Sequence, residues 1–267
     1  MQEPFNGKEQ QQFNETDGGI DTPSAASGAE EDSSALRMQA VQALRSRDGH
    51  KALDLVNAVL DINEADSDAW LIAMQAFQFV LPIEKYKSEN ELTCARSAIY
   101  YAPKPHKYRV RKKVYLFLMA RIIDVLKRDE EVLRNGRQIL DAYQRDVYFD
   151  ANGASRKMIE RDKPVRDAVF ATFTYCAELF DFIPDSFIRK NMECNRKAAQ
   201  VAAQWARTYG FLEMRYELYG RRLTKEYIEK GLSQYARYLR AVKGKEDLLS
   251  TELPFNIYHL DQLEYIQ

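Results

Sequence analysis

The chain has 267 residues, a net charge of −1 and 45% hydrophobic residues, an ordinary composition for a soluble globular protein that buries a sizeable core. Its apolar stretches are too short to span a bilayer, and its first thirty residues lack the basic and apolar regions of a signal peptide. We therefore expect neither a membrane span nor a secretory leader.

The two ends of the sequence are acidic, whereas the body between them is basic. Residues 1–33 contain eight acids, one lysine and few periodic apolar residues, so we expect a disordered arm with a charge of −7. Residues 246–267 contain five acids and no lysine or arginine. Because the whole chain carries −1 and its ends carry −7 and −5, the body carries +11.

Amphipathic helices alternate with polar turns over residues 34–79. One turn is marked by Gly49, and the other consists of residues 63–68. Paired helices of this kind cannot bury their apolar faces alone and must stack on further pairs. The pattern predicts an all-α fold of stacked antiparallel helical hairpins, which is an α-solenoid.

Small and aromatic residues recur over residues 34–103 at a spacing that resembles the tetratricopeptide-repeat family. In that family small residues let the two helices of a hairpin interlock, and large aromatic residues fill the gap between hairpins. Glu64 departs from the pattern because the family usually has a turn proline there, and the loop at residues 81–88 is longer than usual. The resemblance implies TPR-like hairpins in this region and rests on Ala40, Ala43, Ala52, Trp70, Phe77, Ala98 and Pro103.

Proline, glycine and capping residues divide the rest of the body into further helices. We expect one helix to begin at a capping box formed by Ser88 and Glu91, the next to begin at Pro105, and another to begin at Asp129. A strongly apolar helix at residues 165–183 is expected to be central. It is followed by a helix from Asp185 to a stop at Gly210, and by a last helix that carries residues 228–242.

These features predict three parts: a disordered arm at residues 1–33, a helical-hairpin domain at 34–245 and an acidic-aromatic docking tail at 246–267. A division of the helical domain near residues 150–160 is the alternative that the polar break there leaves open. The tail mixes acids with Leu, Phe, Ile and Tyr. We expect it to bury these residues, either on the chain's own groove or on another subunit.

A basic patch at residues 104–113 has six basic residues in ten and no acid. Cations in the first turn of a helix face the positive end of its dipole, so we expect an anionic group to offset them. The candidates are a preceding helix end or the chain's own acidic ends, an acidic partner peptide, and nucleic-acid phosphate. The candidate partner-binding residues are Lys104, Lys107, Tyr108, Arg109, Arg111, Lys112 and Lys113.

Tyrosine and arginine are interleaved from Tyr209 to Arg240. Both residue types are favoured in binding hot spots, but tyrosine also commonly lies at the boundary between core and water. The sequence leaves both interpretations open.

Catalytic and ligand-binding motifs are absent from the sequence. His50, His106 and His259 are isolated, and no nucleotide-binding or hydrolase spacing occurs. Cys94, Cys176 and Cys194 are too far apart for a metal-ligand pair, and we expect buried free thiols in a reducing compartment. We therefore expect no catalytic residues, no cofactor and no metal.

The function predicted from the sequence is that of a cytoplasmic, non-catalytic protein-interaction module or scaffold that recognises an acidic or helical segment of a partner protein. The alternative is a nucleic-acid-associated helical protein that uses residues 104–113. Self-docking of the tail and homo-oligomer formation are further alternatives.

Overall fold

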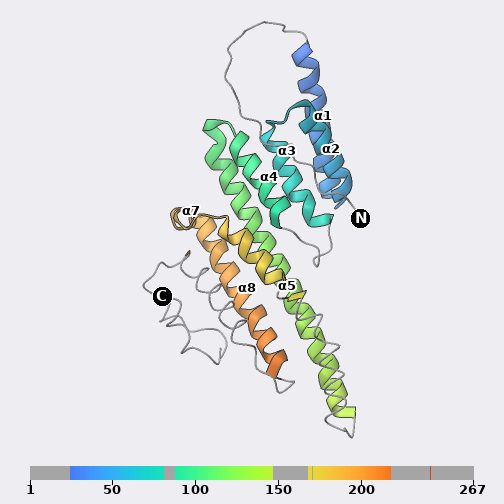
Figure 1. Cartoon of the computed structure of the whole chain (residues 1–267), viewed down its shortest axis with the longest axis vertical. Coiled ribbons are helices and arrows are strands. Elements are labelled where there is room, and N and C mark those ends of the chain that lie inside the picture. The colour runs from blue at the N-terminus through green and yellow to red at the C-terminus, as the bar shows by residue number, and fades with distance from the viewer. Residues whose placement is uncertain (1–24, 81–87, 147–167, 170, 218–240, 242–267) are drawn as a thin grey trace.

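The computed structural model describes residues 25–80, 88–146, 168–169, 171–217 and 241, with side chains for residues 32–80, 88–134, 168–169, 171–210 and 241. These residues are predominantly helical and contain no β-strand, which confirms the all-α prediction (Figure 1). Helix 171–181 is unlabelled in the figure. The labelled helices are α1 (Ala25–Arg45), α2 (Gly49–Ile62), α3 (Ser67–Ala76), α4 (Ser88–Tyr101), α5 (Lys107–Asp146), α7 (Asp185–Lys190) and α8 (Met192–Glu217), with 3₁₀ turns η1 (Phe77–Phe79) and η3 (Lys104–His106).

Aspartate side chains cap α2 and α3 at the two turns that the sequence marks. The Asp48 carboxylate accepts a hydrogen bond from the Lys51 backbone N at 3.0 Å, and that of Asp66 accepts from the backbone N of Asp68 and Ala69 at 3.0 Å each. Such caps satisfy backbone donors that have no partner within the helix. Both polar turns therefore begin a helix as well as ending one.

Gly49 has a packing role in addition to marking the first turn. The residue with a left-handed backbone there is Arg47, with φ of 59°. Gly49 is the first residue of α2, where a Cβ atom would lie 2.7 Å from the Ala76 carbonyl oxygen and 2.8 Å from Val80 Cγ2. The absence of a side chain therefore allows the start of α2 to approach the end of α3.

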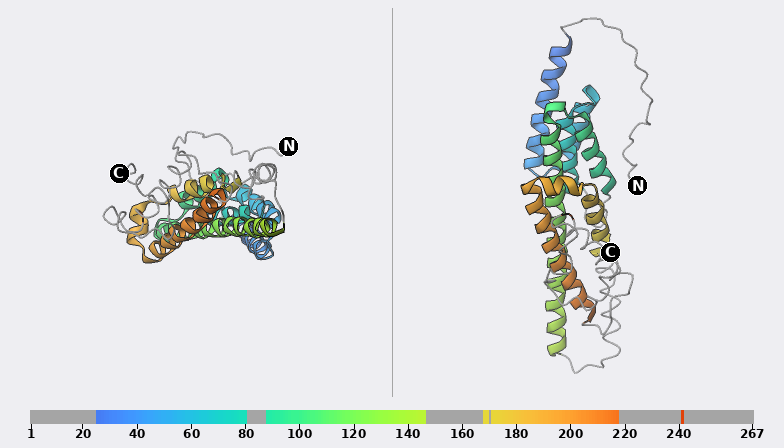
Figure 2. Two further views of the ribbon diagram at one scale, coloured as in Figure 1. Left: turned by 90° about the horizontal axis from the view of Figure 1, so that it is seen from below. Right: turned by 90° about the vertical axis from the view of Figure 1, so that its left-hand side faces the viewer.

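The first four helices pack on one another in chain order, α4 packs against the N-terminal half of α5, and α8 runs alongside α5 from Lys112 past Glu130 (Figures 1 and 2). The hydrophobic core runs through both halves. Val114, Leu118 and Ile122 of α5 are fully buried in it. Burial of side chains of this size stabilises the fold by about 1.5–3 kcal/mol each.

The small alanines of residues 34–103 are buried between helices, and Trp70 is buried as well. The Trp70 indole N–H donates to the Glu64 carbonyl at 2.9 Å, and the Ser67 hydroxyl donates to the Ala98 carbonyl at 2.8 Å. These bonds tie the second turn to α3 and α3 to α4. The buried small residues are Ala40, Ala43, Ala52 and Ala98.

α5 is one continuous helix of 40 residues, so the prediction that a new helix begins at Asp129 is wrong. Asp129 is 6% exposed, and its carboxylate accepts a hydrogen bond from the Thr172 hydroxyl. The aspartate therefore ties α5 to the helix at residues 171–181 rather than capping a helix. Gly210 likewise lies inside α8, because packing overrides the weak helix propensity of a single glycine.

Polar side chains join α5 to α8. The Glu130 carboxylate accepts from Gln204 Nε2 at 2.6 Å and from the Arg207 guanidinium at 3.0 Å. The Thr208 hydroxyl donates to the Leu126 carbonyl at 3.0 Å. A polar seam of this kind fixes the register of the two helices, because each buried group needs its partner.

Helix α1 begins at Ala25, so residues 25–33 are helical and the expected disordered arm is too long by these residues. Alanine and glutamate in this stretch are strong helix formers, which extends α1 toward the N-terminus. Residues 1–24, the polar break near 150–160 and the tail at 246–267 lie outside the described residues. Of the expected helix over residues 228–242, only Ala241 is described, and it is buried in the core.

None of the described helices combines the length and the apolar character that a membrane span needs.

Candidate functional site

The basic patch at residues 104–113 lies at the turn from α4 into α5. Residues 104–106 form η3, and residues 107–113 form the first turns of α5. Val110 and Val114 are buried, so the cations are distributed around the exposed side of the helix. Lys104 and Arg109 are exposed there.

The other patch residues have three different surroundings. Lys107, Tyr108 and Arg111 line a groove between α4, α5 and α7. Lys113 lines a second groove, between α1, α3 and α5. Lys112 forms an ion pair with Glu193 of α8 at 2.5 Å. The patch is therefore divided between two surfaces and one helix contact.

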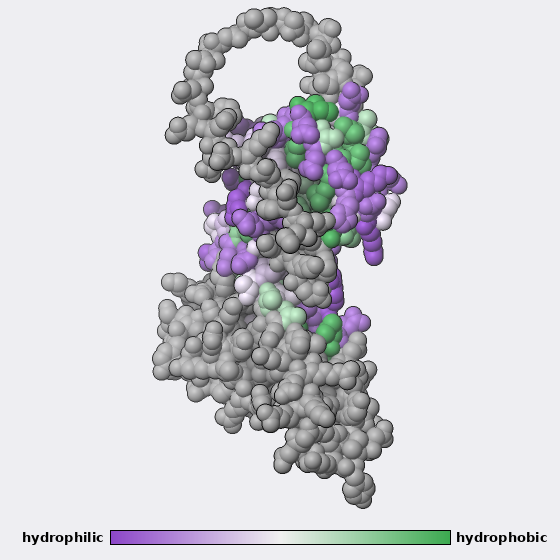
Figure 3. Space-filling view, turned by 45° about the vertical axis from the view of Figure 1, so that its right-hand side comes forward, coloured by the Kyte–Doolittle hydropathy of each residue, from purple (hydrophilic) through white to green (hydrophobic). Residues whose placement is uncertain are grey.

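The first surface is the α1–α3–α5 groove, whose cavity volume is about 1070 Å³. Leu71 and Ile72 of α3 are buried and form its floor. Met38 of α1 lies at its side and is 73% exposed. Figure 3 shows hydrophobic and hydrophilic residues side by side on the face of the molecule that includes α1. The groove therefore offers both apolar and polar contacts.

Cations flank the α1–α3–α5 groove on both sides. Arg37 of α1 pairs with Asp66 at 3.1 Å. Arg45 of α1 and Lys113 of α5 form no ion pair within the described part of the chain, whereas Asp68 is the acid in the lining. The free charge at this groove is thus predominantly positive.

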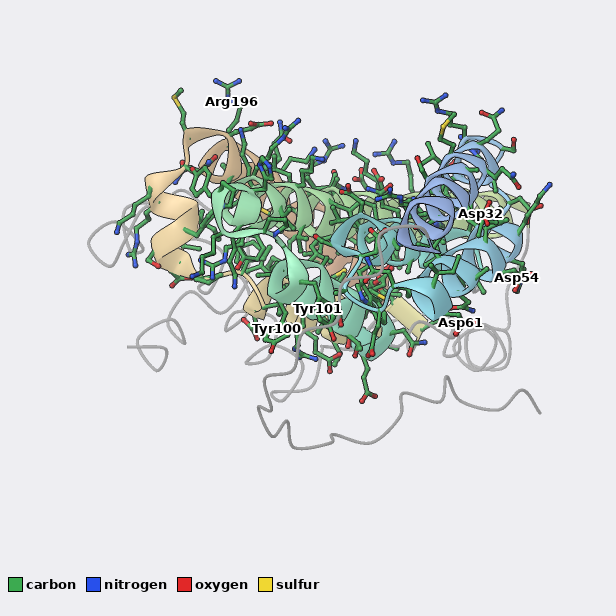
Figure 4. All side chains as sticks on the ribbon, turned by 90° about the horizontal axis from the view of Figure 1, so that it is seen from above. Asp32, Asp54, Asp61, Tyr100, Tyr101 and Arg196 are labelled. Atoms are coloured by element: carbon green, nitrogen blue, oxygen red, sulfur yellow. The ribbon has the colours of Figure 1, made fainter. Side chains whose placement is uncertain are left out.

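Charge is also distributed unevenly over the described side chains. Figure 4 shows nitrogen-tipped side chains along the edge that carries α8, α5 and α1, beginning at Arg196. Asp54 and Asp61 of α2 lie toward the opposite edge. A surface with separated charges attracts partners of opposite charge to one side.

The second surface is the α4–α5–α7 groove, with a cavity volume of about 720 Å³. Its cations come from three helices: Arg96 from α4, Lys107 and Arg111 from α5, and Lys190 from α7. None of the lining residues that the structure describes is an acid. Within the described residues, none of these four cations forms an ion pair with a carboxylate.

Aromatic rings line the α4–α5–α7 groove beside its cations. Tyr108 lies with its ring centre 5.4 Å from that of Phe187, and Tyr115 meets Phe187 edge to face at 4.9 Å. The Arg96 guanidinium lies 5.7 Å from the centre of the Phe182 ring, which is a cation–π distance. Tyr100 and Tyr108 are 73% and 60% exposed, so ring surface is available at the rim.

The α4–α5–α7 groove contains residues that the sequence interpretation missed. Arg96 is the single cation of α4, and Lys190 has only Arg189 beside it in α7, so no large local cluster marked them. Only the packing of α4 and α7 around the start of α5 brings them to the patch. The Asn191 amide supports this arrangement, because it donates to the Tyr108 hydroxyl at 2.9 Å.

A buried ionic cluster lies between α4, α5 and helix 171–181. Glu91 Oε1 is 3.5 Å from Arg121 Nε, and the Tyr175 hydroxyl donates to the Glu91 carboxylate. Burial raises the pKa of Glu91, while the Arg121 charge and these hydrogen bonds oppose the shift. Since Glu91, Arg121 and Tyr175 are all buried, the cluster joins helices and offers no accessible reactive group.

The prediction of a capping box formed by Ser88 and Glu91 is wrong. Glu91 faces the interior, and the Ser88 hydroxyl donates to Glu178.

The remaining candidate groups for chemistry are exposed or inert. His50 and His106 are exposed, and no set of three metal-ligating side chains comes together in the described portion of the chain. Cys94, Cys176 and Cys194 are buried free thiols, as the sequence predicts. Burial raises the pKa of Cys94 to about 12 and that of Cys194 to about 11, which disfavours the reactive thiolate.

Tyr209 is the member of the tyrosine-rich stretch whose side chain is described, and it belongs to the core. It is fully buried and stacks on Trp205 with ring centres 4.8 Å apart. The structure does not describe the other tyrosine and arginine side chains of this stretch, up to Arg240.

Comparison with known proteins gives no match to a family model, to a curated protein or to a solved structure.

Proposed function

We propose that the protein is a non-catalytic interaction module and that the α1–α3–α5 groove receives an acidic or helical segment of a partner protein. The observation that carries this proposal is the apolar floor of Leu71 and Ile72 between cationic sides. An amphipathic helix binds such a groove by burying its apolar face. Acidic residues on the flanks of that helix would then lie near Arg45 and Lys113.

Exposed Met38 supports the choice of a peptide segment as ligand. A methionine side chain adapts its shape to irregular apolar partners and is common on surfaces that bind helices. Its 73% exposure leaves most of its apolar surface in water, and burial against a partner would remove it from water. The groove therefore combines an adaptable apolar contact with charges that select acidic ligands.

The proposal includes a TPR-like arrangement for residues 34–103. Its support is that α1, α3 and α5, which are the alternate helices of the chain order, line the same groove. The buried Trp70 and the small residues between helices agree with such hairpins. We also propose a cytoplasmic location, supported by three cysteines that remain free thiols, as is usual in a reducing compartment.

Co-purification from native cell extract would identify a partner, and its binding segment would then be titrated against groove variants. Met38→Glu places a charge in the apolar contact, and Arg45→Glu with Lys113→Glu reverses the flanking charge. Lys51→Glu, on α2 and outside both grooves, is the matched control. We expect both groove variants to weaken binding at least tenfold, equivalent to about 1.4 kcal/mol, and the control to bind normally.

Two choices make this test specific. Lys112 is left unchanged, because its ion pair with Glu193 joins α5 to α8 and its reversal would disturb the helices themselves. Retention of RNA or DNA, with a steep loss of binding as salt is added, would instead support the nucleic-acid alternative. In that case charge reversal at Arg109 and Lys104, which are exposed in the basic patch, would reduce retention.

A further inference from the structure

We propose that the α4–α5–α7 groove is the docking site of the chain's own acidic-aromatic segment, residues 246–267. This inference concerns a different surface from the α1–α3–α5 groove and does not depend on the proposed partner binding there.

The α4–α5–α7 groove is lined by cations. Arg96, Lys107, Arg111 and Lys190 converge from three helices on one cavity, and none of the described residues that line it is an acid. Like charges held together repel one another, and the groove walls strengthen the field within the cavity. An anionic segment relieves this repulsion. Residues 246–267 have five acids and no lysine or arginine, so their net charge is complementary to that of the groove.

The α4–α5–α7 groove also exposes aromatic rings. Tyr100 and Tyr108 expose most of their surface beside the cations, and arginine and aromatic rings form the contacts typical of binding hot spots. The segment carries Phe255, Tyr258 and Tyr265 among its acids. These rings can pack on the groove tyrosines while the carboxylates meet the cations.

The chain that follows Ala241 is long enough to reach the groove. Ala241 is buried in the core, and 26 residues follow it in the sequence. Fully extended, a chain of this length spans about 86 Å, which exceeds the length of about 60 Å for a 40-residue helix such as α5. A tethered segment also has a millimolar effective concentration, which favours it over a free peptide of the same chemistry.

The acidic N-terminal residues are a poorer match. Residues 1–33 carry a charge of −7, but their only aromatic residues are Phe5 and Phe13. Residues 25–33 are also the first residues of α1, which lines the other groove. The groove with both cations and rings therefore fits the C-terminal segment better.

The test measures a distance within the full-length chain. Cysteines introduced as Ser186→Cys, in the groove wall, and Gln262→Cys, in the segment, are spin-labelled. The native thiols are buried, so the introduced ones label selectively. We expect a short, narrow distance distribution at low salt that broadens as salt screens the charges.

Charge-swap variants decide the assignment. Arg96→Glu with Arg111→Glu should abolish the short distance, as should Asp261→Lys with Glu264→Lys, and combining all four substitutions should restore it. That restoration separates docking from misfolding. Arg45→Glu with Lys113→Glu, in the other groove, should leave the distance unchanged.

Three results would overturn the proposal. One is a broad distribution in the unmodified chain that groove reversal does not alter. Another is a short distance that responds to reversal in the α1–α3–α5 groove instead. The third is a short distance that disappears when labelled chains are diluted with unlabelled ones, which would place the segment on a second copy.

Discussion

Replacing Asp129 with asparagine should stabilise the protein at neutral and alkaline pH and have little effect in acid. Asp129 lies in the middle of α5 at 6% exposure, and its carboxylate accepts a hydrogen bond from Thr172. Burial raises its pKa from an ordinary value of 3.8 to about 7, although the Thr172 hydrogen bond and the charge of Arg128 oppose the shift. The neighbouring Cys176 thiol is buried and un-ionised.

The direction of the effect follows from proton binding. Between pH 3.8 and about 7 the folded protein holds a proton on Asp129 that the unfolded chain releases, so stability falls as pH rises through this range. A difference of about three pH units, at about 1.4 kcal/mol per unit, gives an upper bound of about 4 kcal/mol. Asparagine accepts the Thr172 hydrogen bond without ionising, so Asp129→Asn removes this loss.

Urea denaturation followed by circular dichroism at pH 4 to 8 measures the difference. We expect the free energies of unfolding of the two proteins to agree at pH 4 and the variant to gain by up to about 4 kcal/mol at pH 8. Asp124→Asn, at an exposed position of the same helix, is the control. A variant that is less stable than the unmodified protein at pH 8 would refute the reasoning, because it would mean that ionised Asp129 is well compensated.

Three further predictions concern the interior. Arg121→Met should lower the free energy of unfolding by about 3–5 kcal/mol, because it leaves the buried Glu91 charge without its ion pair. The double variant Glu91→Leu with Arg121→Met should lose much less than the sum of the two single changes. Additive losses in urea denaturation would contradict this coupling. Gly49→Ala should destabilise the protein by about 1–3 kcal/mol through overpacking, because the added Cβ would lie 2.7 Å from the Ala76 carbonyl oxygen. The melting temperature should therefore fall, and an unchanged value would contradict the close approach. At pH 7 the native protein should react with a thiol reagent far more slowly than the unfolded chain, and rapid native labelling would contradict the burial of Cys94, Cys176 and Cys194.

The helical class and the first hairpins could be predicted because their signals are local. Asp48 and Asp66 cap helices at the turns that the polar residues mark, and the buried positions of α2 follow the expected period. Helix caps and amphipathic periodicity depend on neighbours within a few residues. The same local signals predicted too late a start for α1, because residues of high helix propensity extend the helix on the N-terminal side of its first periodic apolar residue.

The sequence interpretation was wrong where the partner of a residue lies far from it in the sequence. Asp129 and Glu91 look like capping residues in the sequence, yet their partners are Thr172, Arg121 and Tyr175 on other helices. A carboxylate that caps a helix and one that is buried in a helix contact have the same local surroundings in sequence.

The candidate site shows the same limit. The basic patch contains Lys107, Tyr108 and Arg111, which line the α4–α5–α7 groove, and their role in partner binding stays a prediction. It could not indicate that Lys112 pairs with Glu193, or that Arg96 and Lys190 join the groove, because these neighbours are determined by helix packing.

The proposed binding of a partner segment in the α1–α3–α5 groove is tested most directly by titrating the identified segment against the Met38→Glu variant and the Lys51→Glu control. Met38 is exposed at the side of this groove, so its substitution leaves the core intact. The proposal predicts at least a tenfold loss of affinity for Met38→Glu and none for Lys51→Glu. Equal affinity of both variants and the unmodified protein would contradict it.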